Sequence, residues 1–254
     1  MNGNGLQVFG SITKNPVATG ADLVAYSGFS SSNYLEQPVN SDLTGAYDSC
    51  FMGWMKTSST SSYQYLFAIG TSGTDVFGLA VQITTGYLYA YDDVNGQQPS
   101  STNVADGVWH HVCLVHKNGV NKQIYVDGKL INTSSTSSYT HSSNAKYRVG
   151  RYFTYPNDFE GSLALQRFSK TIPSPEQIKK IYEDEKVLFQ ENAQATLYGS
   201  SDAVTALAYD DSTNLLHVGT SAGRSVFQGL RRVDNTTTAV GAAISASNGL
   251  VADE

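Results

Sequence analysis

Residues 106–131 have the sequence DGVWHHVCLVHKNGVNKQIYVDGKLI. Over residues 109–115, successive side chains alternate between two faces, which is the period-two pattern of a β-strand. Lys117-Asn118-Gly119 follows as a turn signal, because glycine adopts a positive φ at little cost. A second strand over residues 122–126 ends at another turn dipeptide, Asp127-Gly128, and a third strand begins after it. The stretch therefore predicts a meander of three antiparallel strands.

Three further segments accompany this stretch. They are SSNYLEQPVNSDL at 31–43, SCFMGWMK at 49–56 and FEGSLALQRFSKTIPSPEQIKKIYED at 159–184. Together with G-x-W-H-H-V and Y-V-D-G in the central stretch, they resemble, in the same order, the laminin-G-like domains of the concanavalin A-like jelly-roll superfamily. The resemblance implies an all-β fold, an antiparallel two-sheet jelly-roll sandwich with one C-terminal helix, over residues 1–190. It implies no single activity, because one fold hosts many functions.

Composition limits the functional classes. The chain has 254 residues, of which 40% are apolar and only 15% are charged, and it contains 16 tyrosines. This balance is typical of a β-rich extracellular or virion protein. A net charge of −6 without a basic cluster argues against nucleic-acid binding. We expect no membrane span, since no apolar run approaches about 18 residues. The first ten residues lack the features of a signal peptide, so export would take another route, such as release by lysis.

One helix is expected near the end of the jelly roll. Ser174 has the character of an N-cap, Pro175 suits the first helical position, and Gln177 completes a capping box. Ile178 and Ile181 fall on one apolar face. The pattern predicts a helix that continues to about residue 190.

In the strand at 47–55, Trp54 is expected in the core.

Residues 195–254 differ in character from the preceding part. The sequence DAVTALAYDDSTNLLHVGTSAGRSVFQG at 202–229 resembles one blade of a β-propeller. A lone blade leaves unpaired strand edges and little core. Residues 233–254 hold few bulky apolar side chains and are expected to form an extended arm that orders on a neighbouring subunit. We therefore predict two domains, 1–190 and 195–254, and a homo-oligomer, with a trimer favoured. This blade-and-arm pattern is similar to structural proteins of tailed bacteriophages, which implies other virion proteins as partners.

Aromatic loop residues are candidates for glycan contact. Tyr152, Phe153 and Tyr155 cluster in one loop, and Tyr139 lies in a loop rich in serine and threonine. Aromatic rings stack on the faces of sugar rings, so these four predict a shallow glycan platform. Tyrosine is also enriched at subunit contacts and in packed cores, and this alternative stays open.

No cofactor is required by the sequence, but the resemblance implies that a calcium ion could sit at a loop rim. The candidate ligands are Asp92, Asp93 and Asn95 in one turn, with Asn157 and Asp158 as a second group. Hard oxygen ligands suit calcium. Asp and Asn also stabilise turns through their own backbone, which is the alternative. The closing strand has Leu-Ala-Leu at 163–165 where the family usually carries acidic residues.

Catalysis is not expected. The carboxylate pattern E-x-D-x-E of related glycoside hydrolases is absent from the sequence. The G-x-S-x-G string at 219–223 lies at a turn between two expected strands of the blade-like segment and not between a strand and a helix, so it does not predict a nucleophile elbow. His110 and His111 belong to the strand signature and are interpreted as structural. Cys50 and Cys113, the only cysteines, are predicted to be buried free thiols.

These observations favour a non-enzymatic structural protein of a tailed-phage virion, a tail fibre or a head or tail decoration protein. It would display the jelly roll for contact with a host surface or its glycans. The first alternative is a cell-surface or secreted carbohydrate-binding module, which would place the protein outside the cell. A distant alternative is a polysaccharide-cleaving enzyme.

Overall fold

The computed structural model describes residues 5–71, 75–194, 197, 199 and 203–253. The chain divides into two compact units. One contains residues 5–15 and 25–184, and the other contains residues 16–24 and 185–253. The division predicted near residues 190–195 lies close to this one, and the assignment of the two parts as separate domains stays a prediction. In the described part of the chain, no helix has the length and apolar character needed to cross a membrane.

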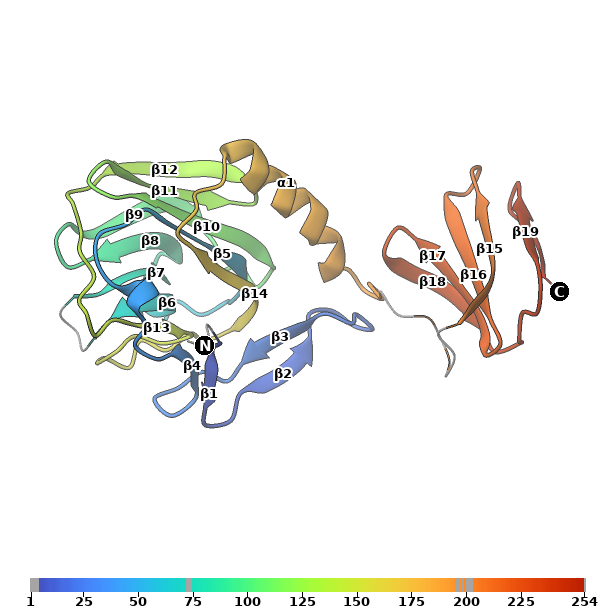
Figure 1. The fold of residues 1–254 in the computed structure, drawn as a ribbon, viewed down its shortest axis with the longest axis horizontal. Coiled ribbons are helices and arrows are strands. Elements are labelled where there is room, and N and C mark those ends of the chain that lie inside the picture. Colours follow the sequence, from blue (N-terminus) through green and yellow to red (C-terminus); the bar gives the residue numbers. More distant parts are fainter. Residues whose placement is uncertain (1–4, 72–74, 195–196, 198, 200–202, 254) are drawn as a thin grey trace. The chain divides into compact units, whose positions relative to one another are not determined.

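Two seven-stranded antiparallel sheets build the first unit (Figure 1). Sheet A has the order β1 (Gln7–Phe9), β4 (Tyr34–Gln37), β13 (Lys146–Val149), β6 (Gln64–Gly70), β7 (Phe77–Val81), β8 (Tyr87–Asp92) and β9 (Gly96–Asn103). Sheet B has the order β12 (Lys129–Ser135), β11 (Asn121–Val126), β10 (His110–Lys117), β5 (Ser49–Lys56), β14 (Ser162–Ser169), β3 (Val24–Ser27) and β2 (Thr13–Pro16). Each sheet combines a run of consecutive strands, β6 to β9 in sheet A and β10 to β12 in sheet B, with neighbours from distant parts of the sequence, as in a jelly roll. The predicted all-β sandwich is confirmed.

The main core lies between the sheets. Phe51 of sheet B and Phe67 of sheet A stack there with ring centroids 4.1 Å apart. Met55, Leu66 and Leu114 are at most 1% exposed in the same cluster. Each such side chain contributes about 1.5–3 kcal/mol when it leaves water. Because every residue of β6 and β7 is buried, their sequences form apolar runs and do not alternate.

The predicted meander is confirmed as β10, β11 and β12. Strand β10 pairs with β11 from Val112↔Val126 to Lys117↔Asn121, and β11 pairs with β12 in turn. Asp127 and Gly128, which join β11 to β12, have φ values of 50° and 72°. Two successive positive φ values suit a tight hairpin turn, and this explains the Asp-Gly dipeptide.

Helix α1 (Pro175–Glu185) begins where the capping box predicts. The backbone N–H of Ser174 donates to Gln177 Oε1 at 2.8 Å, and that of Gln177 donates to Ser174 Oγ at 3.3 Å. Beyond Glu185 the chain continues as a 3-10 turn, η2 (Lys186–Phe189), so the helical segment ends close to the predicted position. The start was predictable because both capping partners lie within four residues.

Helix α1 covers the outer face of sheet B. Ile178 is fully buried there against the side chains of Cys50 and Cys113. Trp54 is 2% exposed, as predicted for a core residue, and its ring lies 5.8 Å from that of Tyr182 on the helix. Helix α1 therefore forms a second layer of core with the part of sheet B that it covers.

The second unit contains a four-stranded antiparallel sheet and a hairpin. The sheet has the order β15 (Val204–Asp210), β16 (Leu215–Thr220), β17 (Gly223–Gln228) and β18 (Arg231–Thr236), and the hairpin consists of β19 (Ile244–Ser247) and β20 (Leu250–Asp253). The segment 16–24 belongs to this unit through the hydrogen bond from Asp22 N to Ala193 O, 2.9 Å long.

The prediction of an extended arm at residues 233–254 was wrong. Its first residues complete β18, and most of the remainder forms the β19–β20 hairpin. Val240 and Ile244 bury their side chains against Ala206 of the blade, and Arg224 forms an ion pair with Asp253 at 2.9 Å. Two buried apolar residues, strand pairing and an ion pair thus order a segment whose overall composition suggested that it would remain extended.

Candidate functional site

Tyrosines of sheet A define the candidate site on its outer face. Tyr65 of β6 and Tyr89 of β8 both pair with Ala80 of β7, and their ring centroids are 6.1 Å apart at 84°. Tyr91 lies two residues further along β8, opposite Gly78. Because strand side chains alternate, this spacing of two puts the tyrosines of β8 on one face. The small residues of β7 leave room for the large rings on either side.

The loop after β13 covers these rings with aromatic residues of its own. Tyr152 lies 4.6 Å from Tyr65, centroid to centroid, and is 5% exposed. Tyr155 stacks on Tyr152 at 6.0 Å and 24°, yet it is 63% exposed. We call the following set the tyrosine surface: Tyr63, Tyr65, Tyr89, Tyr91, Tyr152, Phe153 and Tyr155. Its most exposed member, Tyr155, rests on the buried ring of Tyr152.

Charged groups hold this loop in place. Arg151 forms an ion pair with Asp158 at 3.6 Å across the loop ends, and the two residues also form an isolated β-bridge. The guanidinium of Arg148 lies 4.6 Å from the ring centre of Phe153, and its Nε donates to Glu36 at 2.6 Å. These contacts arrange the aromatic loop before any ligand binds, which lowers the entropic cost of binding.

A polar pair borders the tyrosine surface. The hydroxyl of Tyr91 donates to Asp93 Oδ1 at 2.8 Å, and the other carboxylate oxygen accepts the N–H of Val76 at 2.6 Å. Burial and the hydrogen bond to Asp93 raise the pKa of Tyr91, so it keeps its proton. Asp93 itself is exposed and can accept further hydrogen bonds from a bound molecule.

The four predicted glycan residues therefore have different positions. Tyr155 is exposed on the tyrosine surface, while Tyr152 and Phe153 lie beneath it as support. The placement of Tyr139 on a glycan platform was wrong. Tyr139 is 3% exposed in the main core, and its hydroxyl donates to Asp75 at 3.0 Å. A ring packed on both sides offers no face to a sugar. The strand tyrosines were missed in the sequence, although Tyr63/Tyr65 and Tyr87/Tyr89/Tyr91 recur at a spacing of two.

The predicted calcium ligands also have different surroundings. Asp92 is completely buried, where its carboxylate binds the ammonium of Lys122 and accepts the N–H groups of Val94 and Asn95. An ammonium group thus occupies the position that a cation would need beside Asp92, which corrects its assignment as a ligand. The amide hydrogen bonds agree with the turn interpretation that the sequence left open.

The other candidate ligands have partners of their own. Asp93 faces the outside beside Tyr91, and Asp158 pairs with Arg151. Among the residues that the structure describes, no three His, Cys, Asp or Glu side chains are grouped so as to hold a metal ion.

The sequence of residues 29–179 matches the Laminin_G_3 family, described as the concanavalin A-like lectin/glucanases superfamily. The chain belongs to this superfamily. No curated protein sequence matches it. The membership confirms the resemblance carried by the strand and helix motifs of the first 190 residues.

Solved structures share the superfamily fold at low sequence identity. One is domain 4 of AbnA, an extracellular arabinanase from Geobacillus stearothermophilus, in complex with arabinotriose: TM-score 0.55, 17% identity, covering 68% of this chain and 82% of that one. Another is the ligand-binding domain of botulinum neurotoxin serotype D in complex with N-acetylneuraminic acid. Its TM-score is 0.54 at 14% identity, and the match covers 91% of this chain and 57% of that one. A third is a putative carbohydrate-binding protein from Bacteroides ovatus. Its TM-score is 0.50 at 18% identity, and the match covers 63% of this chain and 47% of that one. At these identities the likeness shows the fold alone. The predicted similarity to phage structural proteins has no counterpart among these matches.

Proposed function

We propose that this concanavalin A-like protein is a non-catalytic carbohydrate-binding protein that holds a glycan on its tyrosine surface. The observation that carries the proposal is the stacking of exposed Tyr155 on buried Tyr152 at 6.0 Å, beside the Tyr91–Asp93 hydrogen bond. Aromatic residues that combine a large apolar face with a polar tip are enriched at contact surfaces, and here an exposed ring is supported by a buried one beside an exposed carboxylate.

The chemistry of the surface suits a sugar. The apolar C–H face of a pyranose or furanose ring can lie on Tyr155, while its hydroxyl groups donate to the exposed carboxylate of Asp93. Only a few polar groups need to be placed accurately for such recognition. The three similar structures support the proposal, because one was solved with arabinotriose, one with N-acetylneuraminic acid, and the third is named as a putative carbohydrate-binding protein.

Binding without cleavage follows from the state of the nearby carboxylates. Hydrolysis of a glycosidic bond uses two carboxyl groups that face one another across the bond, about 5–10 Å apart. Glu36 is held by Arg148 at 2.6 Å and by Lys146 at 3.2 Å, and Asp158 is held by Arg151. These two carboxylates are committed to structural ion pairs, which leaves Asp93 on the tyrosine surface without either of them as a catalytic partner, so we propose that the protein has no glycosidase activity.

The test is the replacement Tyr155→Ala, with Leu250→Ala as its control. Leu250 is 77% exposed on β20 of the second unit, so its loss removes an exposed apolar side chain far along the sequence from the site. Affinity electrophoresis in gels that contain arabinan or other soluble polysaccharides measures binding directly. We expect Tyr155→Ala to weaken binding about tenfold, equivalent to about 1.4 kcal/mol, and Leu250→Ala to leave it unchanged. Equal retardation of both variants and the wild type would refute the proposal.

We also propose an extracellular setting and self-association, with the trimer and the virion location remaining predictions. Self-association is supported by two apolar side chains on one face of β15, Leu207 and Tyr209, which are 60% and 54% exposed. Exposed apolar patches commonly mark contact surfaces. Sedimentation equilibrium of the full chain and of Leu207→Asp tests this part. A monomeric wild type, or an equal mass for both proteins, would contradict it.

A further inference from the structure

A primary amine and a carboxyl group are in direct contact inside the sandwich. Lys122 of β11 faces inward like Ile124 two residues further on, and Asp92 of β8 faces inward like Ala90 two residues before it. Nζ of Lys122 donates to Oδ2 of Asp92, and both residues are 0% exposed. The two groups come from different sheets, so a bond between them would join sheet A to sheet B.

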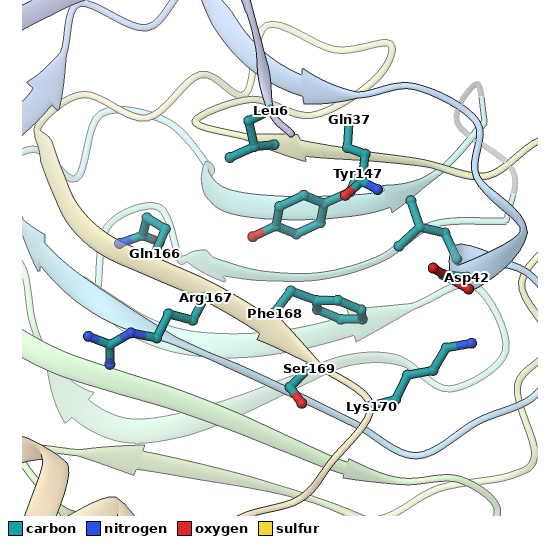
Figure 2. Close-up of a pocket in the computed structure, with 10 residues that line it drawn as sticks. Leu6, Gln37, Asp42, Tyr147, Gln166, Arg167, Phe168, Ser169 and Lys170 are labelled. Carbon is teal, nitrogen blue, oxygen red and sulfur yellow. The ribbon is translucent and has the colours of Figure 1, made fainter. Parts of the chain in front are cut away.

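Aromatic rings surround the amine. Nζ of Lys122 lies 5.9 Å from the ring centre of Phe77, and the ring of His116 lies 4.9 Å from that of Phe77. The opening beside β14 that Figure 2 shows is lined by other side chains, among them Tyr147 and Phe168. Because the reacting pair has no exposed surface, a reaction between its members that releases water is protected from the reverse hydrolysis.

The second carboxylate oxygen, Oδ1 of Asp92, is surrounded by hydrogen-bond donors. It accepts the backbone N–H groups of Val94 at 2.9 Å and Asn95 at 2.6 Å, and Nδ2 of Asn95 donates to it at 2.9 Å. Fixed donors that converge on one oxygen stabilise the negative charge of a tetrahedral intermediate. The carbon Cγ of Asp92 is therefore prepared for attack by the amine that touches its other oxygen.

His116 is placed to move a proton. It is the direct cross-strand partner of Lys122, so the two side chains lie on the same face of the sheet. Neither ring nitrogen of His116 has a hydrogen-bond partner among the described residues. Burial, assisted by the charge of Lys122, lowers the pKa of His116 to about 4, so its imidazole is neutral and can accept a proton. Burial also lowers the pKa of Lys122, against the hydrogen bond to Asp92, and this favours the nucleophilic free amine.

We propose that Lys122 and Asp92 condense into an intramolecular amide, a covalent cross-link between the two sheets. The ammonium group first gives one proton to Oδ2, so that both groups are neutral. The lone pair of Nζ then attacks Cγ, the C–N bond forms, and the negative charge moves to Oδ1. A second proton passes from the nitrogen through His116 to the hydroxyl group at Cγ. The Cγ–Oδ2 bond breaks, that oxygen leaves as water, and Oδ1 regains its double bond. The step consumes no oxidant, reductant or cofactor.

Position distinguishes this pair from a surface ion pair of the same groups. Lys180 and Asp184 on helix α1 are also in contact, at 2.6 Å, but their side chains are 73% and 60% exposed, and water keeps both ionised. Fixed contact between reacting groups supplies an effective concentration of up to about 10⁵–10⁸ M. The ion pair of Lys122 and Asp92 is the unreacted state, which a chain refolded shortly before measurement retains.

Intact-mass spectrometry of the full chain tests the proposal. The native protein is incubated at neutral pH, and a second sample is held in concentrated urea. We expect the native chain to lose about 18 Da, the mass of one water molecule, and the sample in urea to change no further. Trypsin does not cleave after a lysine whose amine forms an amide. The fragment 118–129 should therefore remain joined to the fragment 57–117, which contains Asp92.

Three variants identify the reacting groups. Lys122→Arg keeps the positive charge without a primary amine, and Asp92→Asn/Lys122→Met removes both groups and leaves no unpaired charge, so neither should lose water. Lys180→Arg, the control at the exposed pair, should lose water as the wild type does. A wild-type mass that stays at the sequence value, an equal loss in Lys122→Arg, or a link at another lysine would overturn the proposal.

A fourth variant tests the proton carrier. His116→Phe keeps a ring between Lys122 and Phe77 and should slow the loss of water about a hundredfold, as expected when a general base is removed. A wild-type rate in this variant would exclude His116 from the reaction. The tyrosine surface takes no part in the bond, so the cross-link and glycan binding succeed or fail separately.

Discussion

The ammonium group of Lys122 and the carboxylate of Asp92 meet in the interior of the sandwich, and neither side chain has any exposed surface. Lys122 comes from β11 in sheet B and Asp92 from β8 in sheet A, so the pair joins the two sheets. Asp92 also accepts both the backbone and the side-chain N–H groups of Asn95. Its lone pairs are therefore well satisfied, as a buried carboxylate requires.

Removing one partner of this pair should strongly destabilise the protein. Asp92→Asn leaves the Lys122 ammonium buried without a counter-charge, and we expect the free energy of unfolding to fall by about 3–5 kcal/mol. Urea denaturation followed by circular dichroism measures the loss. The double variant Asp92→Asn/Lys122→Met should recover part of it, because no unpaired charge remains. A loss below about 1 kcal/mol in Asp92→Asn would show that the pair is not buried in solution.

The same pair predicts a sensitivity to acid. Burial acts to raise the pKa of Asp92, but the hydrogen bonds from Lys122 and Asn95 outweigh it and hold the pKa below its ordinary value. A carboxyl group with a lowered folded pKa contributes stability above its unfolded pKa of about 3.9 and loses it as the pH falls through the folded value. The free energy of unfolding should therefore fall below pH about 4, and less steeply in the double variant.

His110 should give the opposite dependence on pH. Its Nδ1 lies 2.8 Å from Asp127 and its Nε2 lies 3.2 Å from Asp106, and the hydrogen bond to Asp127 is the main cause of a raised pKa. A base with a raised folded pKa contributes full stability below its unfolded pKa of about 6.5 and loses it as the pH rises through the folded value. Unfolding measured at a series of pH values should show this decline in the wild type. In His110→Gln the free energy of unfolding should depend less on pH in this range. An unchanged dependence on pH would show that His110 is not its cause.

Gly78 should control the shape of the tyrosine surface. A methyl group added there would lie 2.6 Å from the carbonyl oxygen of Phe67 and 3.1 Å from the ring of Tyr65. The sheet backbone has little room to move, so Gly78→Ala should cost about 1–3 kcal/mol and displace Tyr65 from beneath Tyr152. We expect weaker glycan retardation in addition to a lower unfolding midpoint. Gly5→Ala, where the added methyl meets nothing within 4 Å, is the control. Unchanged stability in Gly78→Ala would contradict the packing described.

The two cysteines should be inert while the protein is folded. Cys50 and Cys113 are buried free thiols with their sulfur atoms 3.5 Å apart, beneath Ile178 of helix α1. The hydrogen bond with Cys50 and burial both raise the pKa of Cys113, so the reactive thiolate is scarce. Ellman's reagent should release no colour from the native reduced protein and two equivalents after denaturation in urea. Cys50→Ala should release one. Rapid reaction of the native protein would mean that the helix opens readily.

Local sequence signals predicted several elements well. The strand pattern at 109–115 and the Asp-Gly turn depend on residues that touch their immediate neighbours, and the helix start depends on the Ser174–Gln177 pair. The superfamily was recognisable for the same reason, since its motifs are short segments in a constant order. The aromatic cluster at 152–155 was visible without knowledge of the fold, and the role of Tyr155 in glycan contact stays a prediction.

Features that join distant segments were predicted poorly. Asp92 was assigned to a rim because its partner Lys122 lies 30 residues away on the other sheet. Tyr139 was placed on a surface because its contact with Asp75 spans 64 residues. The arm at 233–254 was expected to be extended because a composition average does not reveal that Val240 meets Ala206.

By itself the sequence determined where strands turn, where the helix begins and which superfamily the chain belongs to, since each rests on steric and hydrogen-bonding preferences within a few residues. Tertiary structure alone decided which tyrosines share a surface and which carboxylates are available. The reason is that these depend on the register and pairing of strands far apart in the chain. That register is selected by burying apolar side chains across the whole sandwich and not by any one segment.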